Sequence, residues 1–386
     1  MFPKITILAN DYPYKGIMTN VFVQQLVNAM ADLGVTVSVI ASQSLSHCLF
    51  RHGKLKPRHY ICTTKKGNNY DVYCPYSITF GIRYGLLSKY VSGFNKANVI
   101  RIVKKLSPDV LYSHFWHNTW NVLSYAKEKN IPLFVACGEG DDALDRMIQS
   151  VSSEKKKELC SAVSGVISVS SENKRKCLEA GLIGANDIIV LPNCVDTSLF
   201  HKRDALEIRQ SLGLHDDDFV IVFVGSFQYR KGPDRLAEAI TKLDDPQVKS
   251  IFIGKCFDGY KYDFHCDGIV YKGEVNHDEL PQLLNCADVF VLPTLKEGCC
   301  NAIVEALACG LPVISSNGPF NDDILDETNA IRVNPLDVDE IAGAITYLKK
   351  HKDVCDRMRS VSEKRHDSYS IENRASEILK FICSRA

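Results

Sequence analysis

Residues Glu297–Val313 read EGCCNAIVEALACGLPV and follow the apolar run Val289–Leu292. The apolar run predicts a buried strand, and Asn301 is a good N-cap for a helix that ends at Gly310. Another strand is predicted over Pro312–Ser315, directly after that helix. A strand, a loop, a helix and a second strand in this order predict a βαβ unit of a parallel sheet.

The same alternation of short apolar runs and helical stretches extends over the rest of the chain. In the first half it predicts a helix over Val21–Asp32 and strands at Ile5–Leu8, Val35–Ile40, Val110–Tyr112, Leu133–Ala136, Gly165–Val169 and Ile188–Leu191. In the second half it predicts strands at Val220–Val224, Ser250–Ile253, Val289–Leu292 and Pro312–Ser315, and helices near Asp204–Leu212, after Pro233 and over Ala302–Cys309. We therefore expect an α/β fold with two Rossmann-like, doubly wound parallel-sheet domains.

The break at Pro192-Asn193 separates the two series of strands. A chain of 386 residues is longer than one hydrophobic core usually supports, so two domains are expected, over residues 1–195 and 196–368. A C-terminal segment, residues 369–386, has apolar residues at helical spacing and is expected to pack on another surface. Ligands of open parallel sheets bind beyond the carboxyl ends of the strands, so two facing sheets would enclose an interdomain cleft.

Composition excludes several classes of protein. Lysine plus arginine and aspartate plus glutamate each number 46, so the formal net charge is zero. A broad nucleic-acid surface needs an excess of positive charge, and we expect no nucleic-acid partner. No apolar run reaches the roughly 18 residues of a membrane helix, and the N-terminal run is too short for a signal peptide. The expected location is cytoplasmic.

Cysteine and aspartate patterns argue against a metal site. The 15 cysteines are mostly scattered singly in apolar runs, which predicts free buried thiols. Cys299-Cys300 lacks the CxxC spacing of a zinc site. The acidic run Asp216–Asp218 precedes a strand and is expected to be a solvated loop. We expect neither a metal nor another cofactor.

Charged residues gather at two strand-to-helix junctions. A helix that begins at Asn301 beyond a strand favours an anion such as a diphosphate. Glu297 precedes this helix and Glu305 lies one turn inside it, where carboxylates can accept hydrogen bonds from sugar or ribose hydroxyls. Arg230-Lys231 follow another strand and can neutralise a diphosphate. Each of these residues taken alone is more often a solvated turn or helix residue.

The pattern Glu297-Gly298-x-x-Asn301-x-x-x-Glu305, continued to Pro312-Val313, resembles the donor-binding signature of retaining glycosyltransferases of family four. That family has the GT-B fold, in which the C-terminal helix packs back on the N-terminal domain. The resemblance covers nearly the whole chain and is strongest from Gly225 to Val313. It implies transfer of a hexosyl-type sugar from a UDP- or GDP-sugar to an acceptor hydroxyl with retention, in bacterial polysaccharide or glycolipid assembly.

The resemblance also implies roles for individual residues. Glu297 would meet the donor sugar and Glu305 the ribose, while Arg230 and Lys231 would clamp the diphosphate. The family usually has an arginine where this chain has Ser226, so Arg230 would supply that charge. The implied donor-binding residues are Gly16, Ser226, Arg230, Lys231, Glu297, Gly298, Cys299, Cys300, Asn301 and Glu305. The departing phosphate would take the acceptor proton, so no protein base is required.

The acceptor would bind in the N-terminal domain. His114 matches the family's histidine that reaches the donor sugar, with His117 as an alternative, although a histidine at a strand end is more often structural. Implied catalytic residues are His114, Glu297, Arg230 and Lys231, and implied acceptor-binding residues are Trp116, His117, Glu139 and Asp141. For Asp141 and Asp142, a role as N-cap of the next helix is as plausible as a role near the acceptor.

Two further questions stay open. The basic runs Lys54–Arg58 and Lys65-Lys66, with Leu49-Phe50 and Ile82–Leu87 nearby, could contact an anionic membrane that carries a lipid-linked acceptor, or could be solvated. A nucleotide-sugar epimerase of the same fold and a non-catalytic partner of another glycosyltransferase are the alternative functions. An NAD oxidoreductase is disfavoured because no GxGxxG follows a strand.

Overall fold

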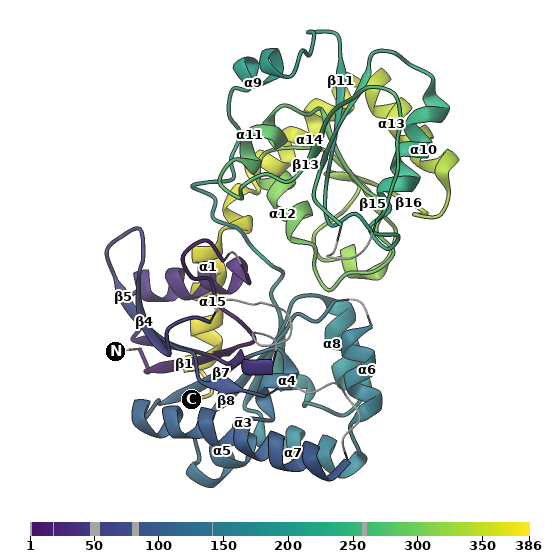
Figure 1. The fold of residues 1–386 in the computed structure, drawn as a ribbon. Coiled ribbons are helices and arrows are strands. Elements are labelled where there is room, and N and C mark those ends of the chain that lie inside the picture. The colour runs from purple at the N-terminus through teal and green to yellow at the C-terminus, as the bar shows by residue number, and fades with distance from the viewer. Residues whose placement is uncertain (1, 18, 47–54, 79–84, 141, 257–260) are drawn as a thin grey trace. The chain divides into compact units, whose positions relative to one another are not determined.

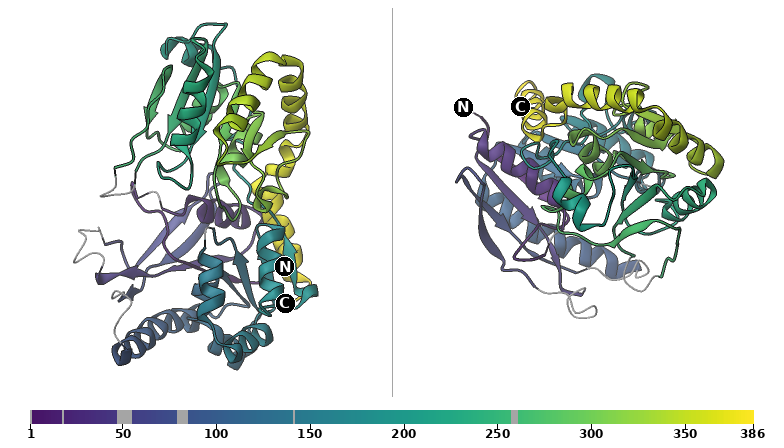
Figure 2. Two further views of the ribbon diagram at one scale, coloured as in Figure 1. Left: turned by 90° about the vertical axis from the view of Figure 1, so that its right-hand side faces the viewer. Right: turned by 90° about the horizontal axis from the view of Figure 1, so that it is seen from above.

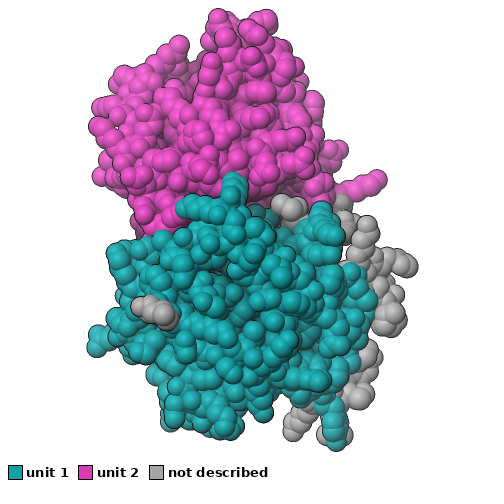
Figure 3. All heavy atoms as spheres, turned by 90° about the vertical axis from the view of Figure 1, so that its left-hand side faces the viewer, with its two compact units in different colours: residues 1–191, 374–386 teal, residues 192–373 magenta. Residues whose placement is uncertain are grey.

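A computed structural model describes residues 2–17, 19–46, 55–78, 85–140, 142–256 and 261–386. The chain divides into two compact units (Figure 3). Unit 1 comprises Met1–Leu191 and Arg374–Ala386, and unit 2 comprises Pro192–Asn373. These divisions lie a few residues from the boundaries expected at 195/196 and 368/369.

Unit 1 is built on an eight-stranded sheet in the order β10-β9-β8-β7-β1-β2-β5-β4 (Figure 1). The strands are β1 (Ile5–Ala9), β2 (Val37–Ala41), β4 (His59–Thr63), β5 (Asn69–Tyr73), β7 (Val110–His114), β8 (Leu133–Cys137), β9 (Gly165–Ser168) and β10 (Ile188–Val190). All pairs are parallel except β4 with β5. A separate parallel pair joins β3 (Gln43–Ser44) and β6 (Tyr76–Ser77).

Helices cover both faces of this sheet, with α1 and α15 on one side and α3 and α5 on the other (Figures 1 and 2). The helices are α1 (Val21–Asp32), α3 (Gly85–Leu106), α4 (Trp116–Thr119), α5 (Leu123–Lys129), α6 (Ala143–Ser150), α7 (Ser153–Ala162), α8 (Ser171–Glu179) and α15 (Ile371–Cys383), with a 3-10 turn at Ala185–Asp187. Central strands β1, β2, β7 and β8 are buried at every residue. This double burial explains why these strands are mostly apolar in the sequence.

Unit 2 contains a six-stranded parallel sheet in the order β13-β12-β11-β14-β15-β16. Its strands are β11 (Phe219–Val224), β12 (Val248–Ile253), β13 (Ile269–Gly273), β14 (Val289–Leu292), β15 (Val313–Ser316) and β16 (Ala330–Val333). Its helices are α9 (Leu206–Ser211), α10 (Pro233–Leu243), α11 (Leu280–Asn285), α12 (Asn301–Ala308), α13 (Val338–Lys350) and α14 (Lys352–Lys364), with 3-10 turns at Pro319–Asn321 and His366–Tyr369. The predicted Rossmann-like sheets are therefore confirmed in both units.

The two segments that connect the units are hydrogen-bonded to each other. Val195 forms a parallel bridge with Ser370. The Val195 N–H donates to the Tyr369 carbonyl, and the Val195 carbonyl accepts from the Ile371 N–H. In unit 1, the Arg374 guanidinium donates to the Leu191 carbonyl at 3.3 Å. These bonds hold the break at Pro192-Asn193 beside the start of α15.

The C-terminal helix α15 packs against the sheet of unit 1, as the family resemblance implies. The rings of Phe381 and Phe134 meet edge to face with centroids 5.9 Å apart. A methyl group added at Gly165 would lie 2.7 Å from Phe381 and 2.9 Å from Phe134. The absence of a side chain at Gly165 therefore lets the helix approach the sheet.

We expect Gly165→Ala to destabilise unit 1 by about 1–3 kcal/mol, because the added methyl overpacks this contact. Unfolding in urea can be followed by tryptophan fluorescence, since both tryptophans, Trp116 and Trp120, lie in unit 1. Gly93→Ala on α3 is the matched control, because a methyl there meets nothing within 4 Å. Equal unfolding midpoints for the two variants would contradict the prediction.

Candidate functional site

Two loops of unit 2 meet beyond the carboxyl ends of the adjacent strands β11 and β14. Residues 225–232 follow β11 and residues 293–300 follow β14. The Leu295 N–H donates to the Arg230 carbonyl at 2.8 Å, and the Arg230 guanidinium donates to the Lys296 carbonyl at 2.6 Å. Parallel pairing of β11 and β14 thus brings together charges that are far apart in the sequence.

Glu297 is the centre of this region. Its Oε1 accepts hydrogen bonds from Lys231 Nζ at 2.6 Å, Thr294 Oγ1 at 2.7 Å and Arg230 Nη1 at 3.0 Å. Only 10% of the Glu297 side chain and 13% of the Lys231 side chain are exposed. Burial disfavours the charged form of Lys231, but the neighbouring Cys300 and Glu297 outweigh that effect and raise its pKa. The lysine is therefore charged at neutral pH.

Helix α12 begins at Asn301, next to this charged cluster. The expectation that Asn301 is the N-cap is wrong, because Cys300 occupies that position and no side chain caps the helix. Asn301 is already helical, and its Oδ1 accepts a hydrogen bond from Asn193 Nδ2 at 2.8 Å. Asn193 also donates to the Cys299 carbonyl at 3.2 Å. An uncapped N-terminus is a position at which the helix dipole favours an anion.

Glu305 lies one turn inside α12 and is 9% exposed. Its Oε1 is 3.3 Å from Nε2 of His277. Burial alone would lower the pKa of His277, but the bond to Glu305, together with the charges of Asp278 and Asp196, raises it. Glu305 is therefore a paired carboxylate, not an exposed helix residue.

The other predicted donor residues lie outside the ion-pair cluster of Glu297. Ser226 Oγ accepts a hydrogen bond from Gln228 Nε2 at 2.6 Å, and Gly298, Cys299 and Cys300 are buried. Burial raises the pKa of the Cys300 thiol to about 11, so it is neutral at pH 7. Gly16 lies in unit 1, in a loop with φ of 82° and open space around its Cα.

A strained turn in unit 1 presents His114. The turn follows β7, and Phe115 has φ 75° and ψ 149°, which is an unusual conformation for a residue with a side chain. Three hydrogen bonds hold it: Phe115 N–H to the Ala136 carbonyl at 3.0 Å, Ser113 Oγ to the Phe115 carbonyl at 3.0 Å, and Trp116 N–H to Glu139 Oε1 at 2.7 Å. Backbone strain of this kind is typical of functional sites.

His114 is the last residue of β7 and is 7% exposed. Burial, with smaller effects of Arg374 and His117, lowers its pKa to about 3, so the imidazole is neutral. Its Nδ1 is buried and has no hydrogen-bond partner in the described part of the chain. A neutral imidazole can hydrogen-bond a hydroxyl group but carries no charge of its own.

The predicted acceptor residues differ in their outcomes. Trp116 is 0% exposed and belongs to the hydrophobic core of unit 1, so its assignment to acceptor binding is wrong. His117 Nε2 is hydrogen-bonded to Asn10 Oδ1. Asp141 lies outside the described residues. Asp142 precedes α6, yet its side chain does not cap that helix.

Metal-ligating side chains are dispersed. Over the described ranges, no three His, Cys, Asp or Glu side chains gather as a metal site would require. Asp218 is not solvated as expected, because it is 7% exposed and its Oδ2 accepts the His215 N–H at 2.7 Å. The described cysteines form no disulfide with one another, although Sγ of buried Cys137 and Cys177 lie 3.6 Å apart.

Comparison with protein families identifies the chain. Residues 204–365 match the model of group 1 glycosyl transferases, and residues 19–199 match the model of glycosyltransferase family 4. The chain belongs to glycosyltransferase family four. The family resemblance of the sequence is therefore confirmed, and the two matches lie mainly on unit 2 and unit 1 respectively.

Two bacterial glycosyltransferases are among the curated relatives of this family four chain. The Bacillus subtilis protein TuaC, whose name assigns it to teichuronic acid biosynthesis, is 29% identical over 64% of this chain and 64% of its own length. An Escherichia coli galactosyltransferase named for UDP-Gal and α-D-GlcNAc-diphosphoundecaprenol is 28% identical over 55% of this chain and 58% of its own length. The chain thus matches less than two thirds of these relatives.

Solved structures share the GT-B fold. Sucrose-phosphate synthase from Thermosynechococcus elongatus has a TM-score of 0.77 at 18% identity, covering 99% of this chain and 98% of that protein. Anabaena HepE in complex with UDP-glucose has a TM-score of 0.74 at 17% identity, covering 99% of this chain and 100% of that protein. At these identities the likeness concerns the fold alone.

Three residues of the candidate site were missed by sequence reasoning. Thr294 contributes a donor to Glu297, His277 pairs with Glu305, and Asn193 joins the start of α12. Asn193 lies at the break between the two series of strands, and Thr294 lies three residues before Glu297, so these positions were the only signal in the sequence. Nothing in the local sequence distinguishes His277 from a solvated histidine.

Burial raises the pKa of Glu139 to about 7, well above its unfolded value of about 4.3. The folded state therefore holds the proton more tightly, and this contribution to stability is lost as pH rises from about 4.3 to 7. Glu139→Gln keeps an acceptor for the Trp116 N–H but cannot ionise. Between pH 4.3 and 7, the unfolding free energy of Glu139→Gln minus that of wild type should therefore rise by about 1.4 kcal/mol per pH unit. Above pH 7 this difference should stay constant.

Urea unfolding at several pH values, followed by tryptophan fluorescence, measures this difference. Glu128→Gln on the exposed end of α5 is the control and should show no such gain. Parallel curves for wild type and Glu139→Gln between pH 4.3 and 7 would rule out an elevated pKa.

Proposed function

We propose that the protein transfers a hexosyl-type sugar from a nucleoside diphosphate sugar to an acceptor hydroxyl, with retention and without a metal ion. The observation that carries the proposal is the shared oxygen of Glu297, which binds Arg230, Lys231 and Thr294 at once. Two cations held beside an uncapped helix N-terminus suit a diphosphate leaving group. Charge that develops on this group would be stabilised by cations that the protein already holds in place.

The proposal gives each carboxylate a role. A diphosphate would compete with Glu297 for Arg230 and Lys231, and the released carboxylate would then accept hydrogen bonds from the donor sugar. Glu305, oriented by His277, would bind the ribose hydroxyls. In unit 1, neutral His114 would hydrogen-bond a hydroxyl group without adding charge.

The proposed acceptor is a saccharide or a lipid-linked saccharide of a cell-surface polysaccharide or glycolipid. Support comes from two relatives, one named for teichuronic acid biosynthesis and one for a diphosphoundecaprenol-linked substrate. UDP-sugars are the first donors to test, because HepE was solved with UDP-glucose. An epimerase would convert a UDP-sugar in the absence of any acceptor, and a non-catalytic partner would bind a donor without consuming it.

We expect Lys231→Ala to weaken UDP binding roughly 10- to 100-fold, because a charged hydrogen bond to the diphosphate is lost. Isothermal titration of the full chain measures this change. Lys242→Ala, which removes an exposed lysine paired with Asp339, is the control and should bind UDP normally.

Glu297→Gln should lower turnover with a donor and acceptor about 100-fold, and unchanged turnover would remove Glu297 from the mechanism.

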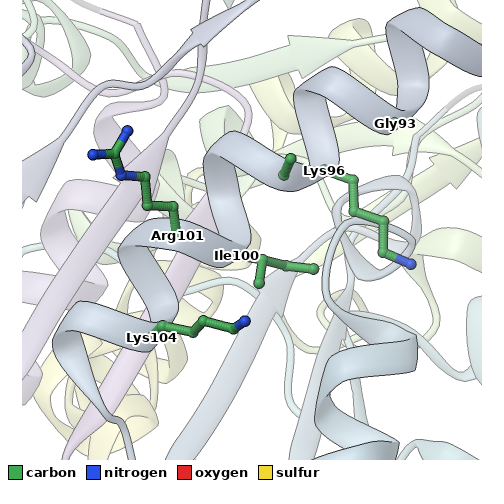
Figure 4. A pocket seen from close by; sticks show the side chains of 6 residues that line it. Gly93, Lys96, Ile100, Arg101 and Lys104 are labelled. Carbon is green, nitrogen blue, oxygen red and sulfur yellow. The ribbon is translucent and has the colours of Figure 1, made fainter.

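We also propose that unit 1 contacts an anionic membrane through α3. Along this helix, a hollow is lined by Gly93, Lys96, Ala97, Ile100, Arg101 and Lys104, and Lys96, Ile100 and Lys104 point to the same side (Figure 4). Tyr90 and Phe94 on the same helix are 77% and 45% exposed. Cations around an apolar hollow, with exposed aromatic rings nearby, fit lipid phosphates.

One lysine of the basic run that first suggested a membrane contact has another role, while Arg58, Lys65 and Lys66 are exposed. Lys56 is 7% exposed and pairs with Asp11 and the Tyr12 carbonyl, so it is structural. Leu49, Phe50, Lys54 and residues 82–84 lie outside the described residues. Among those described, no helix is both long and apolar enough to cross a membrane.

The double variant Lys96→Ala/Lys104→Ala should bind vesicles of phosphatidylglycerol roughly 30-fold more weakly than wild type, because each cation contributes about 1 kcal/mol near an anionic surface. Vesicle flotation measures binding, and phosphatidylcholine vesicles give the background. Lys156→Ala/Lys157→Ala on α7 removes the same charge elsewhere in unit 1. Equal losses in both double variants would indicate a nonspecific charge effect and contradict a contact through α3.

A further inference from the structure

Arg235 is a buried cation beside the candidate site, and it has no role in the proposed transfer reaction. It is the third residue of α10 and is 6% exposed. The carboxylate of Asp234 is close, but its Oδ1 lies 4.0 Å from Arg235 Nη1, beyond hydrogen-bonding distance. A buried guanidinium is costly unless its N–H groups are bonded, so its remaining partners matter.

The partners of Arg235 are backbone carbonyls of the two site loops. Nη1 donates to the Tyr229 carbonyl at 2.9 Å, and Nη2 donates to the Pro293 carbonyl at 2.8 Å. Its Cζ also lies 5.0 Å from the centre of the Tyr229 ring. Tyr229 directly precedes Arg230 and Lys231, and Pro293 begins the loop that leads to Glu297. One rigid, planar group therefore links both loops.

Gly232 shows how closely the guanidinium fits between these loops. A methyl group at Gly232 would lie 2.5 Å from Arg235 Nη2 and 2.7 Å from the Pro293 carbonyl oxygen. Gly232 also has φ of 74°, which favours glycine by itself. The glycine that follows Lys231 is thus required both by its backbone conformation and by the approach of Arg235.

We propose that Arg235 is a positioning residue that holds the loop of Arg230 and Lys231 against the loop of Glu297. This inference rests on the proposed function, in which those cations clamp the donor diphosphate. A lysine cannot replace Arg235, because two carbonyls in fixed directions need the planar fork of a guanidinium, whereas an ammonium is a single point of charge. The affinity for the diphosphate should therefore depend on Arg235, while the affinity for the nucleoside, bound at Glu305, should not.

The experiment compares UDP with uridine on the full-length chain, using Arg235→Lys and Arg235→Met. We expect both variants to weaken UDP binding roughly tenfold or more, with less than a twofold change for uridine in an NMR titration. Arg209→Lys is the matched control, because Arg209 also donates to backbone carbonyls, those of Cys286 and Asp218, away from these loops. It should leave UDP binding unchanged.

The outcomes separate the inference from a purely structural role. Loss of UDP affinity with retained uridine affinity supports positioning of the clamp. Equal losses for both ligands, or unchanged UDP binding in a folded Arg235→Lys variant, would overturn it. If the Arg235 variants do not fold, Gly232→Ala should cause the same selective loss by displacing the guanidinium. Wild-type protein that binds neither UDP nor GDP would instead refute the proposed function itself.

Discussion

The parallel pairing of β11 with β14 is the constraint on which the site of unit 2 depends. Adjacent parallel strands end at the same edge of a sheet, so the loops that follow them must share the space beyond that edge. One loop brings Arg230 and Lys231 and the other brings Glu297, and the three side chains meet at a single carboxylate oxygen. The register of two buried, apolar strands thus determines where three charges lie.

The charges at this edge are balanced within the protein. Lys231 keeps its proton despite burial because Glu297 lies within 2.6 Å, and Thr294 completes the bonding of the carboxylate. Such a balance holds both cations in place before a ligand arrives. A diphosphate that took over the two cations would repeat the same arrangement of charge, so binding would require an exchange of partners rather than a reorganised loop.

In unit 1, by contrast, the central side chain, that of His114, is uncharged. His114 loses its charge through burial at the end of β7, and Glu139 behind the neighbouring turn has a pKa raised by the same cause. Three hydrogen bonds from two strand ends hold Phe115 in its strained conformation. The strain persists because the flanking strands β7 and β8 are paired and buried.

The sequence by itself determined most strands of the two sheet centres, several helices and the motif residues. Helix α1 and strand β14 have the expected bounds, because apolar periodicity and stop signals act locally. The β4–β5 hairpin was not predicted, since β4 is an edge strand without a buried face. Only the tertiary structure decided that Trp116 is a core residue, that Lys56 is buried, and that Arg235 joins two loops. Burial and hydrogen bonding depend on neighbours that are distant in the chain, and those neighbours are selected by strand pairing.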